Sequence, residues 1–193
     1  MDWYRIRHSI RMCMIGSAEA RAEYIKNNKI FHHTGNNCMM MLRKIPLYPK
    51  LISIGDNVWV ASNVTFVTHD VIHKMLNNMI SSHDFEEKLG CINIKNNVFI
   101  GTNTTILPGV TIESNTIIAA GSLVNKNIPG NGVYGGVPVK YICSFDSFVK
   151  KRINQNHIMI KKQKSSLSKE TVQQLWKQMN NSVFNSYEVS CKK

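Results

Sequence analysis

Residues 94–129 read "IKNNVFIGTNTTILPGVTIESNTIIAAGSLVNKNIP", and this stretch repeats itself every six residues. The same period runs through residues 54–71 as IGDNVW, VASNVT and FVTHDV. The first place of every block is aliphatic or Phe, and the fifth place of the unbroken blocks is Val, Thr, Ser or Ile. The fifth place and the next first place are two residues apart, so on a strand both side chains point to one face. Each block is therefore predicted to be a short strand with an inward pair and one outward residue between, such as Trp59 or Phe99.

The fourth place of each block predicts a corner. Eight of the nine blocks have Asn or Gly there, and these residue types tolerate a positive φ. They are Asn57, Asn63, Asn97, Asn103, Gly109, Asn115, Gly121 and Asn127. A strand and a sharp corner, repeated, predict a coiled prism of parallel strands. A meander of hairpins and a helical repeat are excluded, because both would give other periods.

The third block is the exception, since His69 takes its fourth place. From Phe66 to Ile94 is 28 residues, which is not a multiple of six, so residues 70–92 are predicted to leave the coil as a loop and return. Histidine is enriched at positive φ, so His69 could be a substitute corner residue. It also stands at the root of a long loop, and functional loops hang from rigid scaffolds.

Two stretches resemble the hexapeptide-repeat acyltransferases: "IGDNVWVASNVTFVTHD", residues 54–70, and "IGTNTTILPGVTIESNTIIAAGSLVNKNIPGNGVYGGVPVKYI", residues 100–142. The resemblance covers residues 48–143 and is closest to the sugar and polysaccharide O-acetyltransferases that include the maltose and galactoside enzymes. It implies a mainly β fold, a left-handed parallel β-helix of hexapeptide repeats. Residues 1–47 are then a helical N-terminal extension and first segment, and residues 144–193 a basic helical C-terminal extension.

The flanking segments show helical patterns. "SAEARAEYIKNN" begins at Ser17, which suits an N-cap, and its alanines favour a helix. Two apolar faces follow further on: Phe145, Phe148, Val149 and Ile153, and then Val172, Leu175, Trp176, Met179 and Val183. We expect the second face to pack against a neighbouring subunit or an end of the coil, which needs a cover.

The resemblance also implies a function: an acetyl-CoA-dependent O-acetyltransferase that acts on a carbohydrate hydroxyl, in a surface or capsular glycan or its precursor. His69 stands where the family has its general base, with direct transfer and no covalent intermediate. An imidazole with a pKa of ~6.5 can remove a hydroxyl proton near neutral pH and return it to the leaving thiolate. The backbone donor to the oxyanion and the group that orients His69 stay open, with Asp70, Asp84, Glu86, Glu87 and a backbone carbonyl as alternatives for the second.

The residues for acetyl-CoA follow from the same resemblance. Thr102 and Ala120 match small residues that meet the pantetheine arm, Asn125 and Lys126 match a polar–basic pair near the nucleotide, and Lys140 matches a basic residue. Lysines suit phosphates as point charges. Family members usually form homotrimers with acetyl-CoA and acceptor between adjacent prisms, so a homotrimer is expected.

The acceptor residues are less defined. Asp70 and His73 in the loop are candidates, and so is Met41, near the place where the maltose and galactoside enzymes hold the sugar with an asparagine. The stretch "CMMMLRKIPLYPK", residues 38–50, has no asparagine, so their specificity does not transfer. The loop carries four acidic residues against two lysines, which predicts a neutral or amino-sugar acceptor.

Composition adds bounds. The 193 residues suit one domain with appendages, and five scattered cysteines without a CxxC pair favour a reducing, cytoplasmic location. No stretch approaches the ~20 apolar residues of a membrane span, and no signal peptide is expected. The net charge of +12 divides into +6 over residues 1–53, −1 over 54–143 and +7 over 144–193.

Three alternatives remain open. The enzyme could be an N-acetyltransferase on an amino sugar or an antibiotic, or the chain could be a non-catalytic β-solenoid module that binds polyanions through its basic arms. His69, His73 and His83 raise a zinc site, because the related γ-class carbonic anhydrases place zinc ligands on this scaffold. Only proximity in the loop supports zinc, so no metal is expected, and no nucleic acid.

Overall fold

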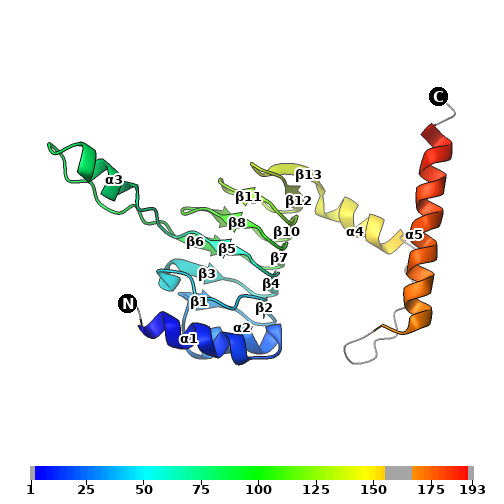
Figure 1. The fold of residues 1–193 in the computed structure, drawn as a ribbon, viewed down its shortest axis with the longest axis horizontal. Coiled ribbons are helices and arrows are strands. Elements are labelled where there is room, and N and C mark those ends of the chain that lie inside the picture. The colour runs from blue at the N-terminus through cyan, green and yellow to red at the C-terminus, as the bar shows by residue number, and fades with distance from the viewer. Residues whose placement is uncertain (1–2, 155–166, 191–193) are drawn as a thin grey trace. The chain divides into compact units, whose positions relative to one another are not determined.

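The computed structural model describes residues 3–154 and 167–190. The chain forms two compact units, residues 1–150 and 151–193. The first unit is a three-sided β-helix, with one sheet on each side of a prism (Figure 1).

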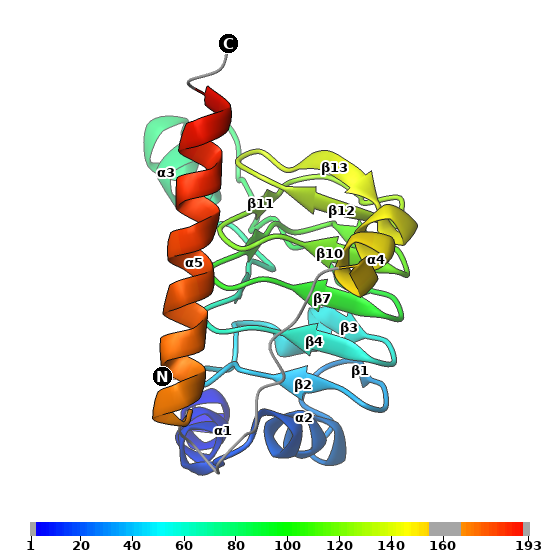
Figure 2. The same cartoon turned by 90° about the vertical axis from the view of Figure 1, so that its right-hand side faces the viewer.

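Short strands stack along each side of the prism. Sheet A contains β1 (His33–Thr34), β3 (Ile52–Ile54), β6 (Ile92–Ile94) and β9 (Thr111–Ile112). Sheet B contains β2 (Met39–Met40), β4 (Val58–Val60), β7 (Val98–Ile100), β10 (Thr116–Ile118), β12 (Gly132–Gly135) and β13 (Lys140–Ser144). Sheet C contains β5 (Thr65–Phe66), β8 (Thr105–Ile106) and β11 (Leu123–Val124). Figure 2 shows sheet B face-on, where every pair is parallel except β12 with β13.

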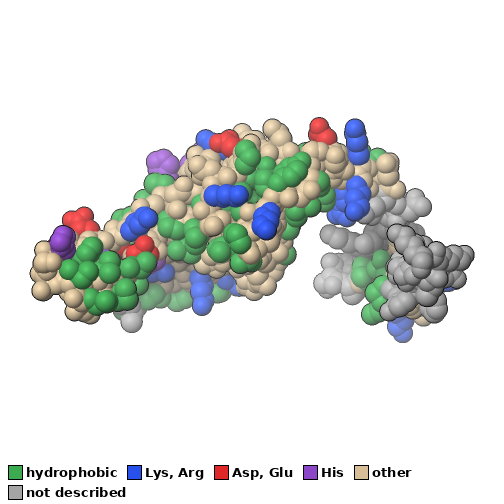
Figure 3. Space-filling view, turned by 90° about the horizontal axis from the view of Figure 1, so that it is seen from above, with side chains coloured by type: hydrophobic (Ala, Val, Ile, Leu, Met, Phe, Trp, Pro, Cys, Tyr) green, Lys and Arg blue, Asp and Glu red, His purple; other side chains and the backbone are tan. Residues whose placement is uncertain are grey.

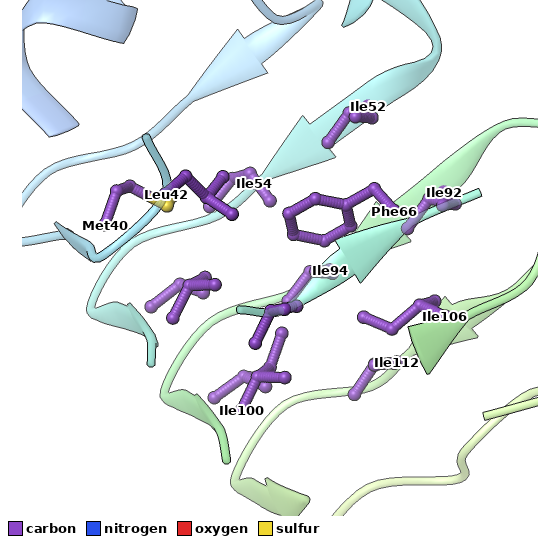
Figure 4. Close-up of a cluster of buried hydrophobic side chains, with 14 of the residues drawn as sticks. Met40, Leu42, Ile52, Ile54, Phe66, Ile92, Ile94, Ile100, Ile106 and Ile112 are labelled. Carbon is purple, nitrogen blue, oxygen red and sulfur yellow. The ribbon is translucent and has the colours of Figure 1, made fainter. Parts of the chain in front are cut away.

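The six-residue pattern determines the register and the core. Val58 pairs with Val98, and Val98 with Thr116, so equal places of successive blocks lie side by side. All first-place residues, and the fifth-place residues of the unbroken blocks, are buried, and many of them form the isoleucine-rich stack of Figure 4. Trp59 and Phe99 lie between the inward pairs and are 44% and 41% exposed. The predicted prism of coiled strands is confirmed.

Seven of the eight predicted Asn and Gly corners have a positive φ, and Asn127 does not. The side-chain oxygen of Asn127 instead accepts a hydrogen bond from the Thr111 backbone N–H at 2.8 Å, and the positive φ falls on Asn131. His69 also lacks a positive φ, because its backbone forms an antiparallel bridge with Leu89. The interpretation of His69 as a substitute corner residue is therefore wrong.

A ladder of side-chain amides runs along the corner between sheets A and B. Asn57 donates to Asn97 at 2.9 Å, Asn97 to Asn115 at 3.0 Å, and Asn115 to Asn131 at 2.9 Å. Each of these residues has a positive φ, so the backbone geometry that makes the corner also aims the amide at the next coil.

Two helices cover the N-terminal end of the prism, α1 (Trp3–Met14) and α2 (Ala18–Asn27). Ser17 is the predicted N-cap of α2, and its hydroxyl accepts from the Ala20 N–H at 3.0 Å. Arg21 is almost fully buried and donates to the carbonyl of Met40 at 2.9 Å, where β2 is the outermost strand of sheet B. The sequence predicted a helical N-terminal extension but located only α2 in it; α1, which buries His8 and Met12, is a second helix of this extension.

The C-terminal extension is helical in its described parts, as α4 (Phe145–Asn154) and α5 (Lys169–Ser190). Val172, Trp176 and Met179 of α5 are exposed, so packing of this face stays a prediction, and the side chain of Val183 lies outside the described residues. Within residues 3–154 and 167–190, no helix is both long and apolar enough to cross a membrane.

Candidate active site

The chain leaves the prism after His69 and rejoins it at β6. We call residues 70–91 the arm, and Figure 1 shows it projecting from the prism with α3 (Ile72–Met79) near its tip. Its root is a short antiparallel ladder, in which the Asp70 N–H donates to the Lys88 carbonyl at 3.1 Å and the Gly90 N–H to the Thr68 carbonyl at 2.9 Å. The sequence predicted a loop here and missed both the helix and the paired root.

His69 packs against a tyrosine in this structure. The ring of Tyr48 lies edge-on to the imidazole, with centroids 5.4 Å apart and an interplanar angle of 85°. The Tyr48 hydroxyl donates to a carboxylate oxygen of Glu87 at 2.7 Å, and this bond, followed by burial, raises the pKa of Tyr48. His69 Nδ1 is buried and accepts or donates no hydrogen bond within the described part of the chain.

Three of the four acidic residues proposed to orient His69 have other partners. Glu87 accepts from Tyr48, and a carboxylate oxygen of Asp70 accepts from the Ile72 N–H at 3.1 Å, at the start of α3. Asp84 accepts a long bond of 3.5 Å from Asn77 within the arm. The contact that the structure gives the ring of His69 is therefore aromatic, and the sequence contained no signal for it.

Thr68 ties the strand before His69 to the loop of residues 41–48. It is 1% exposed, and its hydroxyl donates to the Leu47 carbonyl at 2.7 Å. The 41–48 loop, β5 and the residues before it, and Arg5 of α1 line a half-open cavity of about 670 Å³, the loop cavity. Its walls include Met41, Leu47 and Thr65. Of the three predicted acceptor residues, Met41 therefore lines a cavity, while Asp70 and His73 lie on the arm, where His73 Nδ1 is buried.

The predicted cofactor residues occupy two corners and a hairpin. Thr102 and Ala120 lie on successive coils at the corner between sheets B and C, where the Gly121 N–H donates to the Thr102 carbonyl at 2.8 Å. A side chain at Gly101 would place its Cβ 2.4 Å from the Ala120 nitrogen, so these coils pack as closely as backbone allows. Asn125 and Lys126 are exposed and follow β11.

His69 shares a corner with Asn125 and Lys126. Each of them follows a strand of sheet C, and the coils align because the Val67 N–H donates to the Ile106 carbonyl at 2.9 Å. The Thr102 and Ala120 corner lies on the other side of sheet C. Lys140 is exposed at the start of β13, in the hairpin that ends sheet B. The chain thus brings Thr102 and Ala120 together, and separates them from His69 by one face of the prism.

Metal binding finds no support in the described residues. Among them, no group of three or more His, Cys, Asp or Glu side chains is placed to hold a metal ion. The four described cysteines, Cys13, Cys38, Cys91 and Cys143, are free thiols.

Known proteins share this repeat and this prism. The bacterial transferase hexapeptide family (six repeats) matches residues 92–126. A galactoside O-acetyltransferase from Lactococcus lactis is 31% identical over 158 residues, which are 72% of this chain and 70% of that protein. The chain belongs to the hexapeptide-repeat acyltransferase family.

Two further members of this family are similar to this chain. The galactoside O-acetyltransferase of Escherichia coli is 40% identical over 57% of this chain, and the match spans about half, 52%, of that enzyme. The solved structure of a galactoside acetyltransferase in complex with coenzyme A superposes with a TM-score of 0.51 and 30% identity, over 84% of this chain and 88% of that one. These hexapeptide-repeat proteins confirm the predicted family and β-helix fold.

Proposed function

We propose that this protein is an acetyl-CoA-dependent O-acetyltransferase that acts on a carbohydrate hydroxyl. The observation that carries the proposal is His69, which lies where the repeat stops and adjoins the loop cavity through Thr68 and Leu47. The similar galactoside enzymes, one of them solved with coenzyme A, support the reaction class and the donor.

In the proposed reaction His69 is the general base. Because Nδ1 is buried, Nε2 is the nitrogen that takes the proton of the acceptor hydroxyl. The hydroxyl oxygen attacks the thioester carbonyl carbon, the C–S bond breaks, and the proton passes from Nε2 to the departing thiolate. The Tyr48 ring restricts rotation of the imidazole from one side, and Glu87 fixes Tyr48 by accepting its hydroxyl hydrogen.

The donor is proposed to lie along the corner formed by Thr102 and Ala120. The coils pack closely at Gly101, and the small side chains of this corner would let the thin pantetheine arm lie against it. Asn125 and Lys126 are exposed at the other corner of sheet C, and Lys140 is exposed in the hairpin that ends sheet B; the two lysines suit the nucleotide phosphates.

The complete site is proposed to form between subunits of a homotrimer. Within one chain His69 and the Thr102 corner flank different edges of sheet C, so a neighbouring prism has to bring a thioester to His69. The arm supports this, because Ile72, Met75 and Met79 of the short helix α3 are more than half exposed, and Figure 3 shows hydrophobic side chains gathered on it. Light scattering should give about three times the chain mass of 22.0 kDa, and a monomer at micromolar concentration would contradict a shared site.

Met41, Asp70 and His73 are proposed to contact the acceptor, a surface or capsular glycan or a precursor of one. Met41 lines the loop cavity, and the other two lie on the arm that begins at His69. The free thiols of the described cysteines are consistent with a reaction in the cytoplasm.

The test replaces the base and keeps the fold. His69→Ala should lower kcat by about 10²–10⁴-fold, the usual contribution of general base catalysis, while acetyl-CoA binds as in the wild type. His33→Ala removes an exposed histidine from β1 and serves as the matched control. Release of coenzyme A is followed with a panel of sugars, nucleotide sugars and oligosaccharides. Undiminished acceptor-dependent release by His69→Ala would refute the assignment, and an alkali-stable product bond would indicate transfer to nitrogen.

A further inference from the structure

The helix α1 lies at the N-terminal end of the prism, and its sides have different surroundings (Figure 1). One side buries His8 and Met12. The next side contacts the 41–48 loop, where the Ser9 hydroxyl accepts a hydrogen bond from the Ile45 N–H at 3.0 Å. The remaining side is exposed, and we call it the outer face.

The outer face is a row of apolar side chains beside a row of cations. Trp3, Ile10 and Met14 are 73%, 58% and 70% exposed, and their spacings of seven and four residues place them on one stripe of the helix. Arg7 and Arg11 are also exposed and lie three or four residues from members of this stripe, so they form a second row next to it. The sequence of α1 contains no acidic residue.

Such a face matches the surface of an anionic membrane. An amphipathic helix with an apolar row and a row of cations lies in the plane of the interface, with the apolar side chains between the lipid head groups. Tryptophan is enriched at this depth because its ring is amphipathic, and each arginine near an anionic leaflet adds to the attraction. Residues 1–53 carry a net charge of +6, so the charge around α1 has the matching sign.

A second copy of this chain suits the outer face less well. A symmetric interface would bring Arg7 and Arg11 of two copies toward one another, and like charges in an interface repel. Stable protein interfaces also use about 20–30 residues on each side. The outer face is one side of a helix of 12 residues. A lipid surface requires no complementary shape, so a face of this size is sufficient for it.

The charges beside α1 define where the contact would lie. α2 covers the same end of the prism and exposes Glu19 and Glu23, which an anionic surface repels. The 41–48 loop, on the other side of α1, exposes Arg43 and Lys44. We therefore expect the membrane to meet α1 and this loop, with α2 at the margin of the contact.

The first turn of α1 also borders a cavity beside the proposed base. Tyr4 lines this apolar cavity of about 400 Å³ together with Leu47, Tyr48 and Leu89. Tyr48 packs on the ring of His69, and Leu89 forms a bridge with its backbone. The apolar cavity therefore has α1 on one side and contacts of His69 on the other.

We propose that the outer face of α1 binds an anionic membrane surface, and that the acceptor is carried by that membrane with an apolar part in the apolar cavity. The membrane contact goes beyond the proposed function. The identity of the acceptor rests on the proposed function and specifies its substrate class.

The first experiment measures binding of the full chain to vesicles by co-sedimentation. Phosphatidylcholine vesicles with about a third phosphatidylglycerol should bind the protein about tenfold or more tightly than phosphatidylcholine alone, because Arg7 and Arg11 act on an anionic surface. Arg7→Gln with Arg11→Gln should remove most of this preference. Lys95→Gln with Lys150→Gln removes the same charge from exposed positions outside α1 and should preserve it. Equal binding by the two double variants would overturn the proposal.

The second experiment locates the contact. Trp59→Phe with Trp176→Phe leaves Trp3 as the only tryptophan of the chain. Its emission should move to shorter wavelength on anionic vesicles and should be quenched by lipids with brominated acyl chains. Binding without either change would place the contact elsewhere, for example on the basic residues 144–193, and would refute the role of α1.

The apolar row is tested with Ile10→Ser and Met14→Ser together, which changes two exposed side chains. This variant should bind vesicles about tenfold more weakly than the wild type and should keep its mass in light scattering without lipid. A smaller assembly would show that the outer face joins copies of the chain, and the proposal would be wrong.

The acceptor is tested with one sugar in two forms, as a methyl glycoside in solution and as a long-chain alkyl glycoside inserted in anionic vesicles. The Ile10 and Met14 double variant should lose about tenfold in kcat/KM for the vesicle-borne form and less than about twofold for the soluble form. Equal effects on both would reject a membrane-borne acceptor. If no acceptor releases coenzyme A, the proposed function fails and the acceptor class fails with it, whereas vesicle binding still decides about the outer face.

Discussion

Thr68 offers the most direct test of how the 41–48 loop and the base are connected. Its buried hydroxyl donates to the Leu47 carbonyl at 2.7 Å, and its backbone carbonyl accepts from the Gly90 N–H at 2.9 Å. One residue therefore joins the loop, the root of the arm and the strand that carries His69. Thr68→Val keeps the size of the side chain and removes the hydroxyl.

The expected magnitude follows from these contacts. Losing one buried hydrogen bond and leaving the Leu47 carbonyl without its partner costs about 1–2 kcal/mol of unfolding free energy. Thr68→Ser keeps the hydroxyl but removes a buried methyl group, which costs about 1 kcal/mol. The two variants lose similar stability for different reasons, so activity separates them. With Leu47 released, Tyr48 no longer holds the imidazole, and kcat should fall about tenfold in Thr68→Val but less than about twofold in Thr68→Ser.

Urea unfolding at a fixed protein concentration, followed by tryptophan fluorescence, measures the loss of unfolding free energy. With an m-value of about 2 kcal/mol/M, the midpoint should shift down by about 0.5–1 M in Thr68→Val. Initial rates of coenzyme A release measure the fall in kcat. The reasoning is refuted if Thr68→Val is as stable as the wild type, or if both variants lose the same factor in kcat.

Two further predictions concern stability. In urea unfolding, Asn97→Ala should lose about 2 kcal/mol of unfolding free energy: about 1 kcal/mol from the two amide hydrogen bonds of the ladder and about 1 kcal/mol from placing alanine at a φ of 57°. Asn97→Gly loses the same hydrogen bonds without the backbone strain and should lose only about 1 kcal/mol. Equal losses in the two variants would show that the backbone conformation contributes nothing. Burial, and then the charge of Arg7, lower the pKa of His8 below its usual 6.5, so the stability linked to it is present above pH 6.5 and is lost as pH falls through the folded pKa. Thermal unfolding should therefore show a lower Tm at pH 5 than at pH 7, and a smaller difference in His8→Gln; an unchanged difference would place the titration elsewhere.

The repeat could be predicted from the sequence because every block has to meet the same local requirements. An inward pair at a spacing of two and a residue that tolerates positive φ are all that a coil of this prism requires. The prediction was wrong at Asn127. The residue type suggested a corner with a positive φ, but its side-chain oxygen accepts a hydrogen bond from the Thr111 N–H instead. Within the predicted helical N-terminal extension the prediction located no separate α1, because the buried His8 and Met12, four residues apart, are only a weak helical signal.

The surroundings of His69 could not be predicted in the same way. Tyr48 meets Glu87 across 39 residues, and Leu89 pairs with His69 across the whole arm, so no local pattern encodes either contact. The meeting of Arg5 with Arg43 and Lys44 at the loop cavity likewise depends on the fold, because Arg5 belongs to α1 and lies far from the other two in the sequence.

The amide ladder has a consequence for how such a protein can change its length. The two inner asparagines, Asn97 and Asn115, each donate one N–H to the next coil and accept one from the coil before, so an added coil with the same corner residue would have both hydrogen-bond partners. Whole coils can be duplicated or deleted in a gene without redesign of their neighbours, whereas one residue more or less would break the ladder and the core together. The ladder therefore makes the prism a structure that grows in fixed steps, and each step would change the distance between the loop cavity at one end and Lys140 at the other.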